Sequence, residues 1–527
     1  MRVFQIVAQA ILLAVSAHAA TIYDCYAPVK GGWEIHLTGD KAGPRGDPAK
    51  TIGVVSANAG YSGDPRLHRR PLFPGCDRTM LFSAEELIKL ERVPFRPIAL
   101  AYNEPRFLFD FHSAGGLLGH LMLGLLGPDG SSKWFHQWSE IDVRYVDGRM
   151  EYELRDAAFP GACVHLTAIA LADSAGLLVE VSANGLPTGS SLVWMYGGAS
   201  AFFTNWAMNA PEFAFAPPQC AKNQVRWENG AFTLTRGFDT NDVIMNEVFA
   251  VAKRLPNWKG VIQGGCSWRG KTGMCDPGAV LASPATLVRG TTWAPAGERT
   301  NCVAVYQAEL SGSHAQGIVA IGMGGNIREA IKHPAAARRT ALARNQSIAE
   351  RLITHTPDPY LDAAMTMMAF ATEGTWADQA YVHGGWSWRF AYLGWRILYG
   401  PTCYGWTERV GKTLRNHARL NLVKNGPDKG ALGSMLEYDP GVFYNMNEVF
   451  LDHVRHYFDY TADLELMREL YPVCEGILRW EDRRLRPGDD PLYENALNTW
   501  ISDQHWYIRG QCTQASAYML GANTFMA

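Results

Sequence analysis

The chain has 527 residues, enough for two or more domains that each bury a hydrophobic core. It carries 48 Lys and Arg against 51 Asp and Glu, a formal net charge of −3, so no strong field draws it to nucleic acid or to an anionic membrane. Seventeen tryptophans is a high count for this length. Indole rings stack on sugar faces, which suits a carbohydrate binder, and a Trp-rich core explains the count about equally well.

The first twenty residues have the pattern of a secretory signal peptide. Arg2 precedes an apolar run over residues 3–15, and small residues follow, with cleavage expected near Ala19 or Ala20. The apolar run is too short to span a bilayer, which argues against a membrane anchor, and no later segment is long and apolar enough either. We therefore expect a secreted or periplasmic protein with no membrane span after cleavage.

All ten cysteines follow this leader, so export would allow disulfides to form. Cys266 and Cys275 are the closest pair in sequence, and the connectivity stays open. No CxxC pair and no Cys/His cluster has the spacing typical of metal ligands. We therefore expect no metal site and no cofactor.

Residues 21–325 have the pattern of a large antiparallel β-sandwich domain. Several runs alternate apolar and polar residues, and Gly, Pro, Asp and Asn separate them. The run Val146-Asp147-Gly148-Arg149 predicts a hairpin turn. The Gly-rich segment 113–116 lacks the strand–helix context of a phosphate loop and is interpreted as a turn. The alternating runs are residues 33–37, 141–146, 150–154 and 177–181.

The pattern changes to helical spacing at about residue 326. Residues 326–356 are rich in Ala and Arg and are predicted to form a linker helix, and residues 357–527 a helical domain. Paired helices after a sandwich predict an α/α toroid. The predicted helices are too few to close an (α/α)6 toroid, so we expect an incomplete one in this chain. These helices are residues 359–375, 390–422 with a turn at Gly400-Pro401, 446–460, 464–485, and a last one from about residue 512.

One predicted loop, residues 489–507, is rich in side chains that bind sugars or move protons. Connectors are usually short and built from small turn residues, whereas this one is long and aromatic. Loops on a rigid scaffold are where binding and catalytic residues concentrate. Its candidate substrate-binding residues are Tyr493, Asn498, Trp500, His505 and Trp506.

Four motifs resemble those of bacterial six-hairpin glycosidases with an N-terminal supersandwich. The likeness covers residues 360–527 well and the sandwich loosely. It implies an exported glycoside hydrolase that acts on an oligo- or polysaccharide without a cofactor, in a little-characterised branch for which β-glucuronidase activity is expected. The motifs are His383-Gly384-Gly385-Trp386-Ser387-Trp388-Arg389, Asn445-Met446-Asn447, Pro491-Leu492-Tyr493-Glu494 and Trp500-Ile501-Ser502-Asp503.

The resemblance also implies roles for the first motif. Trp386, Trp388 and Arg389 match sugar-binding positions after the first barrel helix, and His383 is placed to bond a sugar hydroxyl. With a uronic acid as substrate, Arg389 could hold the carboxylate bidentately. An ordinary salt bridge for Arg389, core packing for Trp388 and a structural role for His383 explain these residues at least as well.

Glycoside hydrolysis needs one carboxylic acid to protonate the leaving oxygen and a second carboxylate to activate water or attack the sugar. Glu494 matches the family's general acid best, and its apolar neighbours favour a carboxyl that keeps its proton. Asp503 is the second candidate, although it can equally cap the following turn. Glu448, at the start of the third predicted helix, is the third. The second carboxylate cannot be identified, because the family places it in the half of the barrel that this chain lacks.

Two other functions fit parts of the pattern. A polysaccharide lyase would use Asn498, His505 and Tyr507, although lyases of this architecture commonly place the toroid before the sandwich. A non-catalytic glycan-binding protein would keep sugar binding without turnover. His453 and His456, at i and i+3 on a predicted helix, are interpreted as structural residues and not as metal ligands.

Overall fold

The computed structural model divides the chain into two compact units, one formed by Met1–Glu86 and Arg96–Ala371 and the other by Leu87–Phe95 and Thr372–Ala527. The structure describes residues 27–37, 78–81, 88–90, 93–95, 98–102, 105–110, 117–198, 215, 217–221, 223–237, 259–310, 312–324, 327–376, 380–382, 396–433, 446–486, 488, 490–494 and 511–527.

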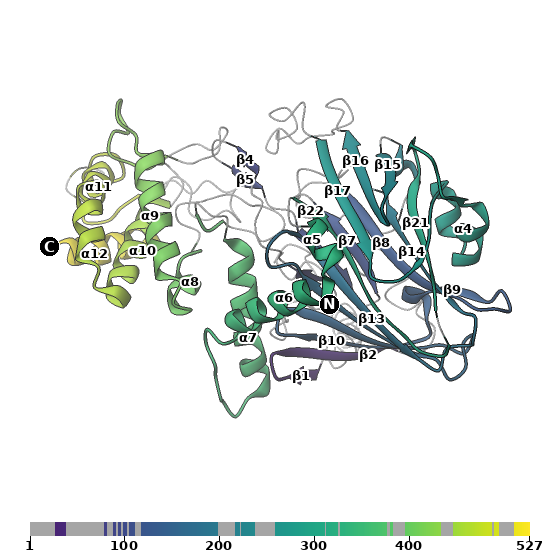
Figure 1. Ribbon diagram of the computed structural model, residues 1–527. Helices are drawn as coiled ribbons and strands as arrows, with labels where there is room; N and C mark the ends of the chain where they lie inside the picture. Colours follow the sequence, from purple (N-terminus) through teal and green to yellow (C-terminus); the bar gives the residue numbers. More distant parts are fainter. Residues whose placement is uncertain are drawn as a thin grey trace, which may run out of the picture. The chain divides into compact units, whose positions relative to one another are not determined.

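Two antiparallel sheets form the first unit (Figure 1). In spatial order, sheet A contains β1 (Ala27–Val29), β2 (Gly32–Leu37), β10 (Glu140–Val146), β11 (Arg149–Arg155), β12 (Cys163–Ala170), β13 (Ala175–Asn184), β22 (Ala315–Met323), β17 (Lys259–Cys266), β16 (Ala231–Gly237), β15 (Asn223–Glu228) and β20 (Glu298–Thr300). Sheet B contains β19 (Thr292–Trp293), β18 (Gly270–Cys275), β21 (Val303–Glu309), β14 (Ser191–Gly197), β8 (Leu117–Leu126), β7 (Arg106–Asp110), β6 (Ile98–Tyr102) and β3 (Arg78–Leu81), with β9 (Ser132–Trp134) paired to β8.

Aromatic side chains fill the space between the two sheets. Trp194 of sheet B stacks on Tyr306 of the same sheet, with ring centroids 5.3 Å apart, and also meets Phe232 of sheet A at 6.1 Å. Phe107 of sheet B packs edge-on against Tyr152 of sheet A at 6.0 Å. All five rings are buried, so several of the aromatic residues counted in the sequence are core residues.

The alternating runs predicted from the sequence are confirmed as strands of sheet A. In β10, for example, Ile141, Val143 and Tyr145 are buried, while Glu140 and Arg144 are exposed. The predicted hairpin is confirmed as well: Val146 pairs with Arg149, and the two residues between them have positive φ, as a tight type I′ turn requires. The sequence did not predict the short helix α4 (Pro284–Gly290), whose N-cap Ser283 accepts a hydrogen bond from the Thr286 amide.

The stretch predicted as one linker helix forms two helices, α5 (Ile327–Lys332) and α6 (Pro334–Ala349). Proline has no amide hydrogen and fits the first turn of a helix, so α6 starts at Pro334 instead of continuing α5. Both helices cover sheet A, where Ile327, Ala330 and Ala341 pack on the buried side chains of Ile169 and Leu178. The Asn345 side chain also donates to the carbonyl of Asp147, in the β10–β11 turn, at 3.0 Å.

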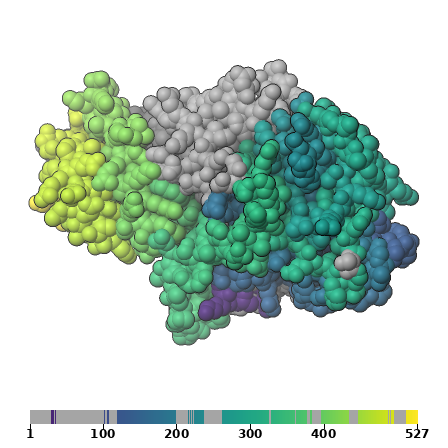
Figure 2. All heavy atoms as spheres, viewed as in Figure 1, coloured from purple at the N-terminus to yellow at the C-terminus, as the bar shows by residue number. Residues whose placement is uncertain are grey.

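The second unit is helical, with the hairpin β4 (Ile88–Leu90) and β5 (Val93–Phe95) grouped to it. The helix predicted over 359–375 is confirmed as α7 (Pro359–Thr375), whose last residues belong to this unit. The predictions for α10 (Met446–Thr461), α11 (Leu464–Arg484) and α12 (Thr513–Met526) are confirmed to within one residue. Helix α10 contacts α8, α9, α11 and α12, and Figure 2 shows the green-to-yellow atoms of α9–α12 as a closely packed body.

The predicted turn at Gly400-Pro401 is wrong. Both residues lie in the short helix α8 (Tyr399–Cys403). Pro401 is in the first turn, where backbone amides make no bond within the helix, so its missing amide hydrogen costs nothing. The chain breaks instead at Tyr404-Gly405-Trp406, where Gly405 has a φ of 75°, before α9 (Thr407–Asn421). Nine helices, α4 to α12, are present among the described residues, and none of them is long and apolar enough to cross a membrane.

The turn glycines of two hairpins offer a matched test of packing in the first unit. Gly148 and Gly230 are each the second residue of a two-residue turn, with φ of 75° and 77°. A Cβ added at Gly148 would lie 2.3 Å from Phe370 and 2.6 Å from Asn345, whereas a Cβ added at Gly230 would have no neighbouring atom within 4 Å. We expect Gly230→Ala to cost about 1–2 kcal/mol for the left-handed backbone, and Gly148→Ala about 1–3 kcal/mol more for overpacking. Urea unfolding of both variants measures the difference, and equal losses would contradict the packing of α6 and α7 on this turn.

Candidate functional site

One end of the helical unit gathers buried polar groups and carboxyls. Only Ala462 and Asp463 join α10 to α11, so the two helices run antiparallel. The N-terminus of α10 and the C-terminus of α11 therefore lie at the same end of the helix pair. Asp463 fixes the opposite end, because its carboxylate accepts from the Leu466 amide and from the Tyr457 hydroxyl, both at 3.0 Å. We call the first end the polar end. Its members are Asn421, Asn447, Glu448, Glu481, Tyr493 and Glu494.

Two asparagines attach the segment after α9 to the start of α10. The Asn447 side chain accepts from the Leu432 amide at 2.8 Å and donates to the Leu432 carbonyl at 3.1 Å. The Asn421 side chain donates to the Gly433 carbonyl at 2.7 Å, and the Gly433 amide donates back to the Asn421 carbonyl at 2.8 Å. The Asn447 side chain, part of a motif noted in the sequence, thus satisfies the backbone of another segment. These bonds bring α9 and α10 to the same end.

Two glutamates are buried at the polar end. Glu448, in the first turn of α10, is 2% exposed, and Glu481, in the last turn of α11, is 0% exposed. Burial raises the pKa of Glu448 to about 7. The pKa of Glu481 is also raised well above its ordinary value, first by burial and then by the carboxylates of Glu448 and Asp482. The pair therefore retains proton at neutral pH, since two unshielded negative charges in this interior would repel each other.

The Glu481 carboxyl is also unusual in its hydrogen bonding. Neither of its side-chain oxygens has a hydrogen-bond partner among the described residues, although both are fully buried. A buried carboxyl without partners is costly when charged and less so when protonated. The hydrogen bonding of Glu481 thus agrees with its raised pKa.

Tyr493 anchors the chain that leaves α11. Its hydroxyl donates to Asp482 at 2.6 Å, its amide donates to the Ser516 hydroxyl at 2.9 Å, and its carbonyl accepts from the Cys512 amide at 2.9 Å. Burial and then the bond to Asp482 raise the pKa of Tyr493 to about 12. Although the sequence suggested Tyr493 as a sugar contact, the structure buries its ring and commits its hydroxyl to Asp482.

Glu494 follows at the same place, on a backbone fixed from two sides. Its amide donates to the Leu485 carbonyl at 2.6 Å, and it forms an isolated antiparallel bridge with Gln511. Its side chain is half-buried, in contrast to Glu448 and Glu481. The polar end thus presents a partly accessible carboxyl on a rigid backbone, at the end of the helical unit that also holds two buried, proton-retaining carboxyls.

Most other predicted site residues lie outside the described residues, so their positions stay predictions. Glu448, Tyr493 and Glu494 are the three that the structure places, and it brings them together at the polar end. The remaining ones are His383, Trp386, Trp388, Arg389, Asn498, Trp500, Asp503, His505 and Trp506.

The sequence reasoning missed Glu481, although a signal was present. Leu466, Leu470, Cys474 and Ile477 form the buried stripe of α11, at spacings of three and four residues. Glu481 stands four residues after Ile477 and continues this stripe. An acid on the apolar stripe of a helix is rare and indicates a pKa shift or a function.

The two histidines of α10 pack on an aromatic ring. Tyr399 lies edge-on to His453 and His456, with centroids 4.8 and 5.0 Å away, and its hydroxyl donates to Asp452. Within the part of the chain that the structure describes, one group of side chains has metal-ligand proximity: Glu153, Cys163 and His165, on sheet A of the first unit.

No disulfide forms among the cysteines that the structure describes. Cys266 and Cys275, the pair closest in sequence, are both free: burial raises the pKa of Cys266 to about 11, and the Cys275 thiol lies 3.5 Å from the Leu287 carbonyl. Cys163, Cys220, Cys302, Cys403 and Cys474 also form no disulfide.

Comparison with known proteins gives one family match and several distant structures. A family described as "Domain of unknown function (DUF4450)" matches residues 114–255, within the first unit, and no curated protein matches the chain. A bacterial glucoamylase in complex with acarbose is similar at 10% identity and a TM-score of 0.43, over 85% of this chain and 69% of its own. Two GH92 enzymes of Bacteroides thetaiotaomicron, an inverting mannosidase and an α-mannosidase, are similar at 8% identity, with TM-scores of 0.39 and 0.36. They are matched over 87% and 84% of this chain, and over 51% and 69% of theirs.

The buried glutamates predict a pH dependence of stability. An acid with a raised folded-state pKa contributes stability that is fully present below its unfolded pKa, near 4.5, and is lost as the pH rises through about 7. Compared with the wild type, Glu448→Gln and Glu481→Gln should therefore gain stability as the pH rises over this range. For a unit of this size each kcal/mol gained moves Tm by about 2–4 °C.

Thermal unfolding at about pH 4.5 and pH 8 tests this expectation. The matched control is Glu475→Gln, because Glu475 lies on the same helix but is exposed and paired with Arg479. Its Tm difference from the wild type should stay nearly constant. A Tm difference for Glu481→Gln that is equally constant would contradict the raised pKa.

Proposed function

We propose that the chain is an exported glycoside hydrolase that acts on a complex glycan by general acid/base catalysis, with Glu494 as the general acid. The observation that carries the proposal is the placement of Glu494: a half-buried carboxyl, on a backbone bonded to Leu485 and bridged to Gln511. The four sequence motifs that resemble six-hairpin glycosidases support it. In that resemblance the β unit is a supersandwich and the helical unit is part of an (α/α)6 toroid.

General acid catalysis of glycoside hydrolysis requires a carboxyl group with two properties. It must hold a proton until the glycosidic oxygen needs it, and it must reach that oxygen. Glu494 is half-buried, so its side chain has access to a ligand, and its fixed backbone limits the positions that it can take. Rigid placement of the acid lowers the entropic cost of reaching the transition state.

Glu448 is a second candidate for the acid, on a different observation. Its pKa near 7 suits a group that donates a proton at neutral pH, but its 2% exposure leaves little of it in reach of a sugar. We assign Glu448 and Glu481 to the support of the polar end and Glu494 to the chemistry. Variants of Glu494 and Glu448 separate the two assignments.

The finer substrate assignment is a uronic-acid-containing glycan, with β-glucuronidase activity. Arg389 would bind the uronate carboxylate through two parallel hydrogen bonds, and Trp386, Trp388, Trp500 and Trp506 would stack on the sugar rings. His383, Asn498 and His505 would form hydrogen bonds with hydroxyl groups of the sugar. The reaction would need no cofactor and no metal.

The test is release of reducing sugar from a panel of uronate-containing and neutral oligosaccharides. Glu494→Gln should keep substrate binding and lose about 10²–10⁴-fold in rate, the share that a positioned acid supplies. The loss should be smaller for an aryl glycoside with an activated leaving group, because that group leaves without a proton. Glu448→Gln, Asp503→Asn and the surface control Glu475→Gln should not show this dependence on the leaving group.

Other outcomes would move the assignment or end it. Leaving-group dependence in Asp503→Asn or Glu448→Gln, and not in Glu494→Gln, would transfer the role of the acid. Products that absorb in the ultraviolet band of unsaturated uronates would show a lyase. Glycan binding by calorimetry without any turnover across the panel would show a glycan-binding protein and contradict the hydrolase.

A further inference from the structure

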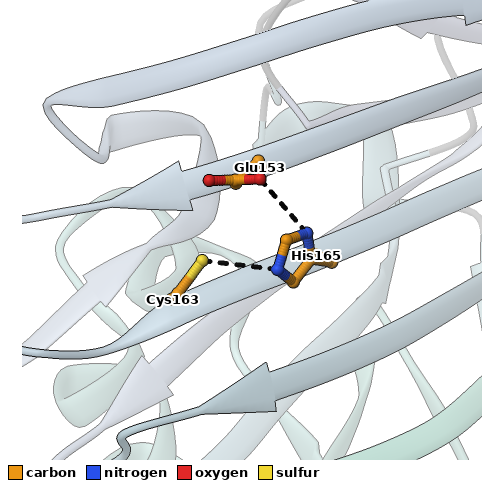
Figure 3. A group of neighbouring side chains, drawn as sticks. All are labelled: Glu153, Cys163 and His165. Atoms are coloured by element: carbon orange, nitrogen blue, oxygen red, sulfur yellow. Dashed lines mark hydrogen bonds and ion pairs between the residues drawn. The ribbon is translucent and has the colours of Figure 1, made fainter.

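Three chemically unlike side chains meet on the outward-facing side of sheet A, in the first unit. Cys163 and His165 are two residues apart on β12, so they point to the same side of the sheet. The strand register places Glu153 of β11 directly opposite His165. Figure 3 shows the three side chains converging, with the imidazole between the thiol and the carboxylate. None of them is buried, so the site is open to solvent.

The distances suit a shared metal ion. The Cys163 sulfur lies 3.4 Å from His165 Nε2, and Glu153 Oε2 lies 3.6 Å from His165 Nδ1. One ligand atom from each residue falls within 4.8 Å of the other two. Metal–sulfur and metal–nitrogen bonds of about 2.3 and 2.0 Å at a tetrahedral angle put the two ligand atoms about 3.5 Å apart. The sulfur–Nε2 pair therefore already has this separation. The Glu153 carboxylate, which faces Nδ1, has to turn toward Nε2 to complete the ligand set, and its long side chain allows this.

The surrounding charges suit a divalent cation. Arg155 pairs with Glu153 Oε1, which leaves Oε2 free to face His165. Asp142 lies opposite Glu153 on β10, so a second carboxylate stands beside the group. With Cys163 as thiolate, the three negative groups outweigh the one guanidinium by two charges, which a divalent ion neutralises.

A nucleophilic thiol is the competing interpretation, because a Cys–His–Glu series also occurs in catalytic triads. Here the three side chains lie on the open face of a sheet and none of them is buried, whereas catalytic thiols act in a cleft that holds the substrate. A bound cation would take the thiolate as ligand and release its proton to solvent.

We propose that Cys163, His165 and Glu153 form a binding site for a zinc-class divalent ion, with thiolate, imidazole and carboxylate as three ligands and water as the fourth. Borderline ions such as Zn²⁺ take this mixed set of sulfur, nitrogen and oxygen donors, whereas Mg²⁺ and Ca²⁺ prefer oxygen alone. The site is independent of the polar end and of the proposed hydrolysis.

Cobalt substitution tests the site with a readout that does not depend on activity. The reduced, chelator-treated protein is titrated with Co²⁺, and the expected result is one ion per chain with a thiolate-to-cobalt charge-transfer band and visible bands of tetrahedral Co²⁺, both lost on addition of Zn²⁺. Cys163→Ser should abolish the charge-transfer band. His165→Ala and Glu153→Gln should weaken binding by more than the about 10–100-fold that loss of a supporting group causes.

Cys403→Ser is the matched control, because Cys403 is an exposed free cysteine in the helical unit. It should leave the spectrum and the affinity unchanged. The three ligands lie outside the core, so unchanged circular dichroism should accompany every variant. A charge-transfer band that survives Cys163→Ser, a band lost in Cys403→Ser, or binding only at millimolar Co²⁺, as an adventitious ion only, would each overturn the proposal.

Discussion

Burial of two carboxyls between antiparallel helices is the constraint on which the helical unit depends. Glu448 and Glu481 belong to α10 and α11, and each occupies a position that would otherwise take an apolar side chain. Ionising both would place like charges in a medium that screens them poorly. The fold tolerates the pair because proton is retained, so the protonation state is part of how α10 and α11 pack.

The same end of the unit carries its remaining polar connections. Asn447 and Asn421 bond the backbone of the segment after α9, and Tyr493 binds the chain after α11 to Asp482 and Ser516. The bonds of Tyr493, together with the bond from the Glu494 amide to the Leu485 carbonyl, fix the backbone around Glu494, whose own side chain is half-buried. The polar end thus combines rigid support with an accessible acid, the combination that general acid catalysis uses.

Much of the fold could be predicted because its periodicity is local. The alternation in residues 141–146 and 150–154, and the turn at Asp147-Gly148, fix β10, β11 and their register without reference to distant residues. The two-helix linker and the break after Tyr404 escaped prediction, since proline at a helix start and proline at a helix end look alike in sequence.

The sites were harder to predict because they depend on neighbours that are far apart in sequence. The pKa of Glu481 is raised first by burial and then by Glu448, thirty-three residues before it, whereas the sequence shows only an acid on an apolar stripe. The spacing of Cys163 and His165 is not typical of zinc motifs. Residues two apart share a face only on a strand, and Glu153 comes from the neighbouring strand β11. The most direct measurement is infrared difference spectroscopy of the carboxyl groups at neutral pH, wild type minus the Glu448→Gln/Glu481→Gln double variant. The account predicts a protonated carboxyl carbonyl band that is present in the wild type and lost in the variant, and its absence from the wild type would contradict a polar end that retains proton.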